Sequence, residues 1–365
     1  LFKGKTVNFK NSIAAIIVAG IIFLGLFYNN QETNNRNFNF SYSVSFNSTN
    51  GKKFEAWIPY PQSNEVQNIS NIEIKTDLEF EILNEEKHGN KYIYLYSLNG
   101  LNGQADFELS CDVDRMENLS VNFSNVDQLN YLEGSSQVVV GSIFDNVISE
   151  NNLSSDNMRN VYDYVLNGMH YGKPTDDRDS KNYKYIHGGK NPNTGKEWLP
   201  NGITYGRKRV TKNELVKSQK KNEKYAYGNG NSLYACDIGV GNCTDYHSYF
   251  ISLSRTLDVP ARFHMGFPIP EGDEGKVGGY HCWADYYKDD KGWTPVDISE
   301  ADKAPEKSDY FFGTICKNRV EFMVGRDFDL KNYNGGYVNI FIYPIVEVGD
   351  ISSNNFSKSF YYKDL

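Results

Sequence analysis

The sequence predicts an α+β protein made of three successive parts. A basic flank followed by an apolar run predicts a membrane anchor over residues 1–30. Apolar residues that alternate with polar ones then predict a β-sandwich domain over 37–133. Apolar residues spaced three and four apart predict helices in a second domain over 134–350, and residues 351–365 remain as a C-terminal tail.

The composition narrows the class of protein. With 365 residues, the chain is long enough to bury two separate cores. Aromatic residues make up 15% of the sequence, which is typical of strand-rich proteins because aromatic side chains cover a pleated surface well. The net charge of −8 leaves no excess of basic residues for a phosphate backbone, so we expect no nucleic-acid partner.

The expected anchor begins with a positive flank. Lys3, Lys5 and Lys10 precede residues 11–30, which carry no charge. No cleavage site with small residues follows, because Leu-Phe-Tyr-Asn stands at 26–29, and an uncleaved anchor is therefore favoured over a signal peptide. The basic flank should stay in the cytoplasm. We expect a membrane-anchored or secreted protein whose later parts lie outside the cytoplasm.

Strand patterns fill the predicted sandwich. At 38–46, aromatic or apolar residues alternate with Asn and Ser, as they do on a strand with one buried face. Cys111 falls on the apolar face of another such run, which favours a core position for it. Turns rich in Gly and Asn separate the runs. The expected strands lie at 38–46, 54–58, 78–83, 92–98, 105–113 and 119–123.

The second domain is expected to begin with a helix and a long polar insertion. Ser155 and Asp156 are suited to cap a helix whose apolar positions run from Met158 to Met169. From 172 to 232 the chain is rich in Lys, Asn and Gly and has no apolar period, so we interpret it as an inserted polar loop. The basic runs within it are interpreted as solvated surface.

A cysteine stands where a further helix begins. Apolar residues recur at helical spacing from Tyr246 to Leu257, and Pro260 limits the helix because the residue before a proline avoids the helical conformation. Cys243 is therefore expected at the helix N-terminus, where unpaired backbone N–H groups favour a thiolate over a thiol. The same N–H groups are suited to hold an oxyanion.

His281 and Asp297 are expected to meet across a β-hairpin. If Tyr286 pairs with Gly292, His281 lies directly opposite Asp297 at contact distance, whereas a register shifted by one residue would separate them. A carboxylate beside an imidazole fixes its tautomer and stabilises the imidazolium. The neighbouring Cys282 should turn away from His281 because side chains alternate along a strand.

Four motifs, in order, resemble the core of the transglutaminase-like superfamily. They read Gly-Asn-Cys-Thr-Asp at 241–245, Leu-Asp-Val-Pro-Ala-Arg at 257–262, His-Cys-Trp at 281–283 and Gly-Trp-Thr-Pro-Val-Asp at 292–297, and short motifs at 310–313, 318–319 and 343–344 resemble the tail of bacterial members. The resemblance implies a papain-like α+β fold with an antiparallel sheet and a helix that carries the nucleophile. It also implies a catalytic triad with Cys243 as nucleophile, His281 as base and Asp297 as the group that orients the base, which agrees with the chemistry expected of these residues. The insertion leaves the oxyanion donor upstream of Cys243 unassigned.

The resemblance implies an enzyme that attacks protein or peptide amides and forms an acyl-thioester on Cys243. Hydrolysis by water, as in a cysteine peptidase or amidase, is the function we favour. Transfer to an amine, which crosslinks proteins, and a non-catalytic surface binding module are the alternatives. The triad serves hydrolysis and transfer equally, so the exclusion of water from the site would separate them.

Two other arrangements compete for the same residues. Cys243 and His247 are four apart on one helix, with Cys236 and Cys282 near in sequence, so zinc binding is conceivable. No paired Cys-x-x-Cys motif accompanies them, and we expect neither a metal nor another cofactor. His247 could also serve as the base, but we favour a structural hydrogen bond for it. One disulfide among Cys236, Cys282 and Cys316 stays open.

Overall fold

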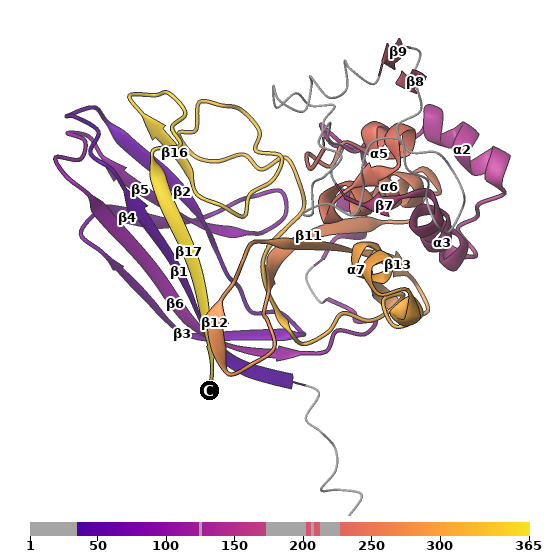
Figure 1. Cartoon of the computed structure of the whole chain (residues 1–365), viewed down its shortest axis with the longest axis horizontal. Coiled ribbons are helices and arrows are strands. Elements are labelled where there is room, and N and C mark those ends of the chain that lie inside the picture. The colour runs from indigo at the N-terminus through magenta and orange to yellow at the C-terminus, as the bar shows by residue number, and fades with distance from the viewer. Residues whose placement is uncertain (1–34, 124–125, 173–201, 206–207, 212–226) are drawn as a thin grey trace, which may run out of the picture.

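The computed structural model describes residues 35–123, 126–172, 202–205, 208–211 and 227–365. The predicted anchor, residues 1–30, lies outside this part and stays a prediction. Within the described ranges, no helix is both long and apolar enough to cross a membrane. The chain is a mixed α+β structure with antiparallel sheets, as predicted, and Figure 1 shows two sheets on one side and most of the helices on the other.

Two antiparallel sheets make up the strand-rich part. A five-stranded sheet has the order β12-β17-β1-β6-β3, and a four-stranded sheet has the order β16-β2-β5-β4. The first contains β12 (Glu274–Lys276), β17 (Phe356–Asp364), β1 (Asn35–Phe46), β6 (Ala105–Met116) and β3 (Gln67–Thr76). The second contains β16 (Ile345–Val348), β2 (Phe54–Tyr60), β5 (Lys91–Ser97) and β4 (Glu79–Asn84).

The period-two patterns predicted most of these strands. β1, β2 and β6 cover the expected ranges, and β4 and β5 differ from theirs by one residue at each end. Cys111 is fully buried opposite Phe40, as expected of a core residue. The strand expected at 119–123 is wrong, because Val121 forms only an isolated bridge to Trp293. β3 is missing from the prediction because its pairing with β6 shifts register between Ser70 and Glu73, which breaks the alternation of apolar and polar residues.

Both sheets take a strand from the end of the chain. The segment expected as a C-terminal tail contains β17, which pairs along β1 from Phe38–Asp364 to Phe46–Phe356, and β16 pairs with β2. The division of the chain near residue 134 stays a prediction. If the two parts fold separately, β16 and β17 have to go with the first.

The five-stranded sheet also packs on the sheet that carries the candidate site. Phe40 on β1 contacts Phe267 and Phe322, with ring centroids 5.2 and 5.6 Å away. At the other end of β1, Phe46 packs on Phe54 of β2, with centroids 4.9 Å apart. One continuous apolar core therefore runs beneath all three sheets.

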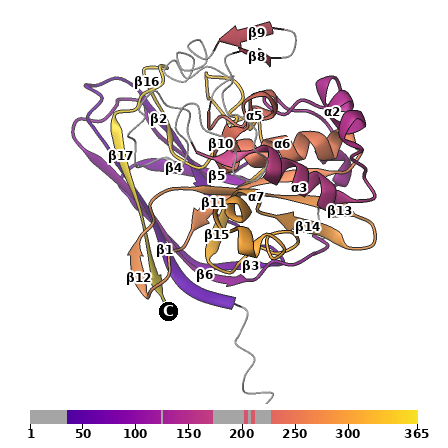
Figure 2. The same ribbon diagram turned by 45° about the vertical axis from the view of Figure 1, so that its right-hand side comes forward.

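A third sheet with helices on one side forms most of the rest of the described chain. The strands, in the order β14-β13-β11-β15, are β14 (Gly292–Val296), β13 (His281–Lys288), β11 (Ala261–Pro268) and β15 (Arg319–Val324). The helices are α2 (Ile143–Asn151), α3 (Met158–Gly168), α5 (Ser232–Ile238), α6 (Cys243–Thr256) and α7 (Ile298–Lys303), with 3-10 turns at Gln128–Tyr131 and Pro305–Lys307. Figure 2 shows α6 and α3 lying along the strands of this sheet.

The predicted helix near residue 158 is present with a different cap. Asn157, rather than Ser155 or Asp156, accepts the backbone N–H of Asn160 and starts α3. Of the expected insertion, the structure describes one hairpin, β8 (Gly202–Tyr205) and β9 (Lys208–Thr211), and the segment from residue 227. β7 (His170–Tyr171) pairs in parallel with β10 (Val240–Gly241), which joins the two sides of the insertion just before α6.

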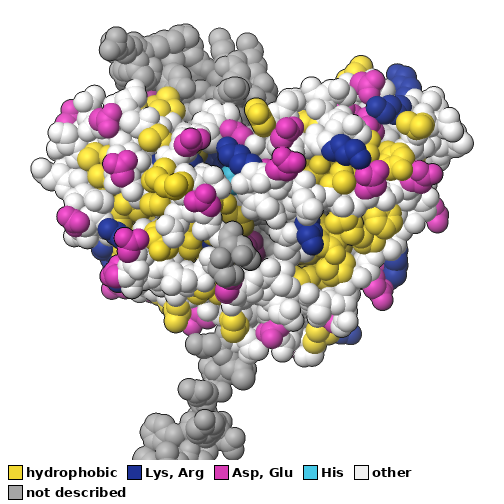
Figure 3. Space-filling view, turned by 180° about the vertical axis from the view of Figure 1, so that it is seen from behind, with side chains coloured by type: hydrophobic (Ala, Val, Ile, Leu, Met, Phe, Trp, Pro, Cys, Tyr) yellow, Lys and Arg dark blue, Asp and Glu magenta, His cyan; other side chains and the backbone are white. Residues whose placement is uncertain are grey.

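Basic and acidic side chains are interspersed on the face of the molecule in Figure 3. Apolar side chains lie between them in small groups, as is usual for a protein surface. No large field of one sign lies on this face, so any electrostatic steering of a charged partner would have to come from elsewhere on the protein.

Candidate active site

The first turn of α6 is built around a capping box. The Asn242 side chain accepts the backbone N–H of Thr244 at 2.9 Å, and the Asp245 carboxylate accepts the backbone N–H of Asn242 at 3.0 Å. Cys243 is therefore the first residue of the helix, where the sequence placed it. Its own backbone N–H is among the first of the helix, which have no acceptor within the helix. That N–H and the positive end of the helix dipole both favour negative charge at this point.

The Asp245 carboxylate binds the segment 228–230 to the start of α6. Besides the cap, its carboxylate accepts the backbone N–H groups of Gly228 at 2.9 Å and Gly230 at 3.0 Å. Burial raises the pKa of Asp245 to about 7 against the effect of these three hydrogen bonds. Asp245 belongs to the motif at 241–245, but the sequence alone assigned it no role. Its partners Gly228 and Gly230 lie 17 and 15 residues upstream, beyond the range of local patterns.

Gly230 has no room for a side chain. It adopts φ +62°, and a Cβ atom there would lie 2.6 Å from Ser248 Oγ and 2.7 Å from Thr244 Cγ2. We expect Gly230→Ala to lower the free energy of unfolding by about 3 kcal/mol, since backbone strain and overpacking add. Gly51→Ala is the matched control, because Gly51 has φ +76° but open space around it. Gly51→Ala should lower the free energy of unfolding, measured in urea, by only about 1 kcal/mol. Equal losses in the two variants would contradict the steric argument.

His281 and Asp297 form a buried hydrogen-bonded pair. His281 Nε2 lies 2.7 Å from Asp297 Oδ2, and the two residues are 5% and 0% exposed. Asp297 is the N-cap of α7, and its other oxygen accepts the Ser299 hydroxyl and the Glu300 backbone N–H, each at 3.1 Å. The carboxylate is thus held by a helix start as well as by the imidazole.

The register of the hairpin differs from the expected one. Tyr286 pairs with Thr294 and Lys288 pairs with Gly292, so the pairing of Tyr286 with Gly292 is wrong by two residues. A shift of two keeps every side chain on its face, whereas a shift of one would not. Asp297 follows the end of β14 and reaches His281 from the α7 cap, so the contact survives the shift.

The Cys243 thiol contacts both His281 and a second thiol. It is 3% exposed and lies within hydrogen-bonding contact of the His281 ring and of Cys282. The hydrogen bond from Cys282, followed by that from His281, holds the pKa of Cys243 well below its usual range although burial opposes this. Because Asp297 occupies Nε2 of His281, Nδ1 is the ring nitrogen left for the thiol. Cys282 Sγ lies 3.6 Å from Thr244 Oγ1 in the first turn of α6, and its expected orientation away from His281 stays a prediction.

Charge separation between the thiol and the imidazole is favoured at this site. Burial alone would lower the pKa of His281, but Asp297 and the Cys243 thiolate outweigh it and raise that pKa to about 10. Burial would likewise raise the pKa of Asp297, but His281 and Arg319 hold it well below its usual range. The site therefore favours a thiolate beside an imidazolium, with an ionised carboxylate behind it.

His247 has a structural role, as we favoured. Its Nδ1 donates to the Cys243 carbonyl oxygen at 2.7 Å, and its Nε2 accepts the Ile298 backbone N–H at 3.1 Å. Burial lowers the pKa of His247 to about 4, so the ring is neutral. With both ring nitrogens used, His247 ties α6 to α7 and has no nitrogen left for a zinc ion or for the thiol. The structure has no disulfide among Cys236, Cys282 and Cys316, all of which lie in the described part of the chain.

Arg319 lies behind the pair of His281 and Asp297. Its Nη1 donates to Asp297 Oδ2 at 3.0 Å, its Nη2 lies 3.3 Å from Cys316 Sγ, and the guanidinium lies 5.0 Å from the Trp283 ring centre. Sequence reasoning did not assign it a role. The only signal for it was its place in a motif at 318–319.

Removal of this buried guanidinium should be costly. We expect Arg319→Met to lower the free energy of unfolding by about 3 kcal/mol, because Asp297 loses a charged partner in a site without solvent. Lys331→Met is the matched control, since its ion pair with Glu81 at 2.8 Å is exposed and screened by solvent, and its loss should change the stability far less. Urea unfolding of both variants measures the difference, and similar losses would show that the Arg319 pair contributes no more than a surface pair.

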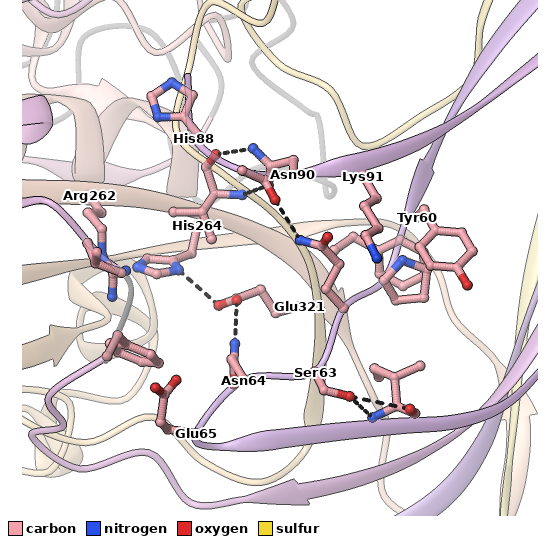
Figure 4. A pocket seen from close by; sticks show the side chains of 18 of the residues that line it. Tyr60, Ser63, Asn64, Glu65, His88, Asn90, Lys91, Arg262, His264 and Glu321 are labelled. Atoms are coloured by element: carbon pink, nitrogen blue, oxygen red, sulfur yellow. Dashed lines mark hydrogen bonds and ion pairs between the residues drawn. The ribbon is translucent and has the colours of Figure 1, made fainter. Parts of the chain in front are cut away.

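A cavity of about 590 Å³ lies apart from these residues. Figure 4 shows it between the strand-rich part and β11 and β15, with His264 Nδ1 2.9 Å from Glu321 and Asn64 also 2.9 Å from Glu321. None of Cys243, His281 and Asp297 lines it. The Trp283 ring stacks on both His264 and His281 and separates the cavity from the triad. We place the candidate site at the three residues rather than at the cavity, because only they combine a nucleophile, a base and an orienting group.

Comparison with known proteins identifies the segment that carries this site. Residues 203–298 match the sequence model of the transglutaminase-like superfamily, and they contain Cys243, His281 and Asp297. The chain is also 33% identical over 170 residues to an uncharacterised protein of Haemophilus influenzae. That match covers 37% of this chain and 46% of the relative, so the chain spans less than half of the relative's length. The resemblance in the sequence motifs is thus confirmed for this segment.

Two solved structures are similar over most of the chain at low identity. One, described as a candidate cysteine protease from Cytophaga hutchinsonii, shares 13% identity with a TM-score of 0.49, over 91% of each chain. The other is the periplasmic domain of TgpA from Pseudomonas aeruginosa, with 12% identity and a TM-score of 0.32, over 76% of this chain and 91% of that one.

Proposed function

We propose that the chain is a transglutaminase-like thiol enzyme that hydrolyses protein or peptide amides. Cys243 is the nucleophile, His281 the acid and base, and Asp297 the group that orients His281. One observation carries the proposal: a thiol at the start of α6 contacts an imidazole whose far nitrogen lies 2.7 Å from a buried carboxylate. Such an arrangement activates a thiol without any metal or cofactor.

Acylation follows from the charges at the site. The Cys243 thiolate attacks the amide carbonyl carbon and forms a tetrahedral oxyanion. The backbone N–H of Cys243 points to this oxygen from the helix start, and a second donor is not assigned. The C–N bond then breaks, and the proton of His281 goes to the departing nitrogen, which leaves an acyl-thioester on Cys243 and an amine in solution.

Deacylation reverses the roles. His281, now neutral, takes a proton from water as the water oxygen attacks the thioester carbon. The C–S bond breaks, the acid product leaves, and the thiolate and imidazolium are restored. Asp297 keeps Nε2 protonated throughout, so Nδ1 alone exchanges protons with the reactants.

Transfer to an amine is the second candidate. The burial of Cys243 and His281 favours it, because a site that excludes water gives an amine the advantage over water. The same residues would perform both reactions, and only the final acceptor of the acyl group differs.

One incubation separates the candidates. A peptide with a glutamine side chain is mixed with the protein and a primary amine, and the products are weighed by mass spectrometry. Hydrolysis gives a peptide with glutamate or a cleaved backbone, transfer gives a peptide–amine conjugate, and a binding module leaves the peptide unchanged. An unchanged peptide, together with an unmodified Cys243, would reject the enzyme proposal.

We also propose that the catalytic part lies outside the cytoplasm and stays attached to the membrane through residues 1–30. The basic flank and the uncharged run after it support this orientation. Protease added to intact cells should remove the bulk of the protein. Survival of the bulk, while a control surface protein is cut, would reverse the proposed orientation.

A further inference from the structure

One oxygen of the Asp297 carboxylate is shared by two donors. His281 Nε2 and Arg319 Nη1 lie 2.7 and 3.0 Å from the same atom, Oδ2. The other oxygen is occupied by the start of α7, where it accepts the Ser299 hydroxyl and the Glu300 backbone N–H. The guanidinium and the imidazole are therefore separated by a single oxygen atom, and the charge of one acts on the protonation of the other.

The Arg319 guanidinium is held both at its edge and on its face. The residue is 3% exposed and begins β15, where it pairs with Pro268 of β11. Its Nη2 lies 3.3 Å from Cys316 Sγ, and the guanidinium lies over the Trp283 ring, which also stacks on His281. Solvent ions screen a buried charge much less than an exposed one, so this cation acts strongly on its neighbours.

The charges around His281 come from three elements. They are Cys243 and His247 on α6, Asp297, Glu300 and Lys303 at α7, and Arg319 on β15. The His247 ring is neutral, and Glu300, whose Oε1 lies 3.8 Å from His281 Nε2, is paired with Lys303 at 2.7 Å. Within this set, Arg319 is the buried cation that opposes Asp297 and the Cys243 thiolate.

The charges at the site change during the proposed reaction. With the thiolate present, burial lowers the pKa of His281, but Asp297 and the thiolate outweigh burial and raise that pKa to about 10. Formation of the acyl-thioester replaces the thiolate by a neutral sulfur. Deacylation then needs an imidazole without a proton on Nδ1, although Asp297 still favours the imidazolium. The positive charge of Arg319 works against reprotonation of the ring at this stage.

We propose that Arg319 is a positioning residue that holds the Asp297 carboxylate against His281 and, by its charge, keeps Nδ1 of His281 unprotonated after Cys243 has been acylated. The inference rests on the proposed function in taking Cys243 as the nucleophile and His281 as the base. It gives the guanidinium a part in the second half of the reaction, separate from its contribution to stability. No proton passes to or from Arg319, because the water proton still goes to Nδ1 and the acyl group to the water oxygen.

A simpler interpretation is that Arg319 only neutralises a buried carboxylate and stabilises the fold. That role predicts a lower melting temperature for Arg319→Met and no change in the protonation of His281. A charge that acts on the imidazole predicts instead that the midpoint of His281 protonation rises when the charge is removed. Lysine at this position keeps the charge, so it should restore most of the midpoint even though it lacks the guanidinium geometry.

The test is a titration of His281 by nuclear magnetic resonance in the full-length chain with isotope-labelled histidine. All variants carry Cys243→Ala, which removes the thiolate as acylation does, and the resonance that His281→Gln deletes is that of His281. Arg319→Met should raise the midpoint by about one pH unit, the effect of removing one nearby positive charge. Arg319→Lys should raise it by much less.

Arg262→Met is the matched control. Arg262 is also 3% exposed, lies on the same sheet and pairs through two nitrogens with the buried Asp285. Its loss should lower the melting temperature, as the loss of Arg319 does. It should leave the midpoint of His281 unchanged, because the Arg262 charge acts on Asp285 and not on Asp297.

The outcomes separate this inference from the proposed function. A midpoint that Arg319→Met does not move, or that Arg262→Met or Arg319→Lys raises as far, overturns the inference alone. The proposed function fails separately if Cys243 of the unsubstituted chain resists iodoacetamide at every pH. If Arg319→Met does not fold by circular dichroism, Arg319→Gln decides, because it removes the charge but keeps an N–H donor for Asp297. An unchanged midpoint in Arg319→Gln then overturns the inference.

Discussion

Cys243→Ala is expected to abolish turnover, and His281→Ala should cost nearly as much. Residues that act as one unit are not additive, so the loss of either should reduce kcat by a factor on the order of 10⁶. The reason is visible in the contacts. The contact with His281 is one of those that hold the pKa of the Cys243 thiol below its usual range, so the loss of either residue disables the same pair. Product formation per folded molecule measures the effect, and a double variant should be no worse than either single one.

The pH dependence of the rate follows from the pKa values of Cys243 and His281. As pH falls through the lowered pKa of Cys243, the thiolate is protonated and the rate is lost. As pH rises through the pKa of His281, about 10, the leaving group loses its acid and the rate falls again. Because the Cys243 thiol and the His281 imidazole interact, each limb of the pH–rate profile reports an apparent pKa of the pair and not of one residue. The activity should therefore persist over a broad plateau between them.

Selective alkylation provides the control for the identity of the nucleophile. At about pH 6 an ordinary thiol is mostly protonated, so iodoacetamide should label Cys243 before the others. Cys316 is the stringent comparison, because burial would raise its pKa but Arg319 outweighs burial and lowers it. Cys111 should not react at this pH, since burial raises its pKa to about 12. A labelled peptide that contains Cys236, Cys282 or Cys316, with Cys243 unmodified at every pH, would contradict the assignment.

Local sequence patterns predicted the elements whose residues are neighbours in the chain. The start of α6 near Cys243 was predicted from the apolar stripe between Tyr246 and Leu257, which is a short-range signal. The strands β1 and β6 follow from a strict alternation over their whole length. The meeting of His281 and Asp297 was predicted through the wrong register, and it survived because the error was an even number of residues.

Long-range partners could not be predicted in this way. Arg319 lies twenty-two residues beyond Asp297 and reaches it from a separate strand, and no periodicity reports such a contact. Cys282 follows His281 on β13, and its sulfur lies 3.6 Å from Thr244 Oγ1 on α6, a contact between residues 38 positions apart. The pairing of β17 with β1 joins the two ends of the described chain, which a reading of local patterns cannot show.

Asp297→Asn is expected to keep the fold and lose about 10⁴ in kcat. Asparagine caps helices as well as aspartate does, so the hydrogen bonds to Ser299 and Glu300 at the start of α7 should persist. The amide differs in its charge and in its N–H₂ group. With the amide N–H donating to Nε2 of His281, the ring proton moves to Nδ1, the nitrogen that must accept protons, and the base is lost.

Asp285→Asn is the matched control for this loss, because Asp285 is a buried aspartate on the same sheet that bonds Arg262 and His264 and does not touch His281. It should lower the melting temperature, since Arg262 loses its charged partner, yet leave the rate per folded molecule unchanged. Asp297→Asn also removes the charged partner of Arg319, so it too should lower the melting temperature, with a nearly unchanged far-UV spectrum at room temperature. Unlike Asp285→Asn, it should reduce the rate per folded molecule at every pH. A variant at Asp297 that keeps its rate within about tenfold of wild type would mean that His281 is oriented by another group. Glu300 is the carboxylate to examine next in that event, because its Oε1 lies 3.8 Å from His281 Nε2.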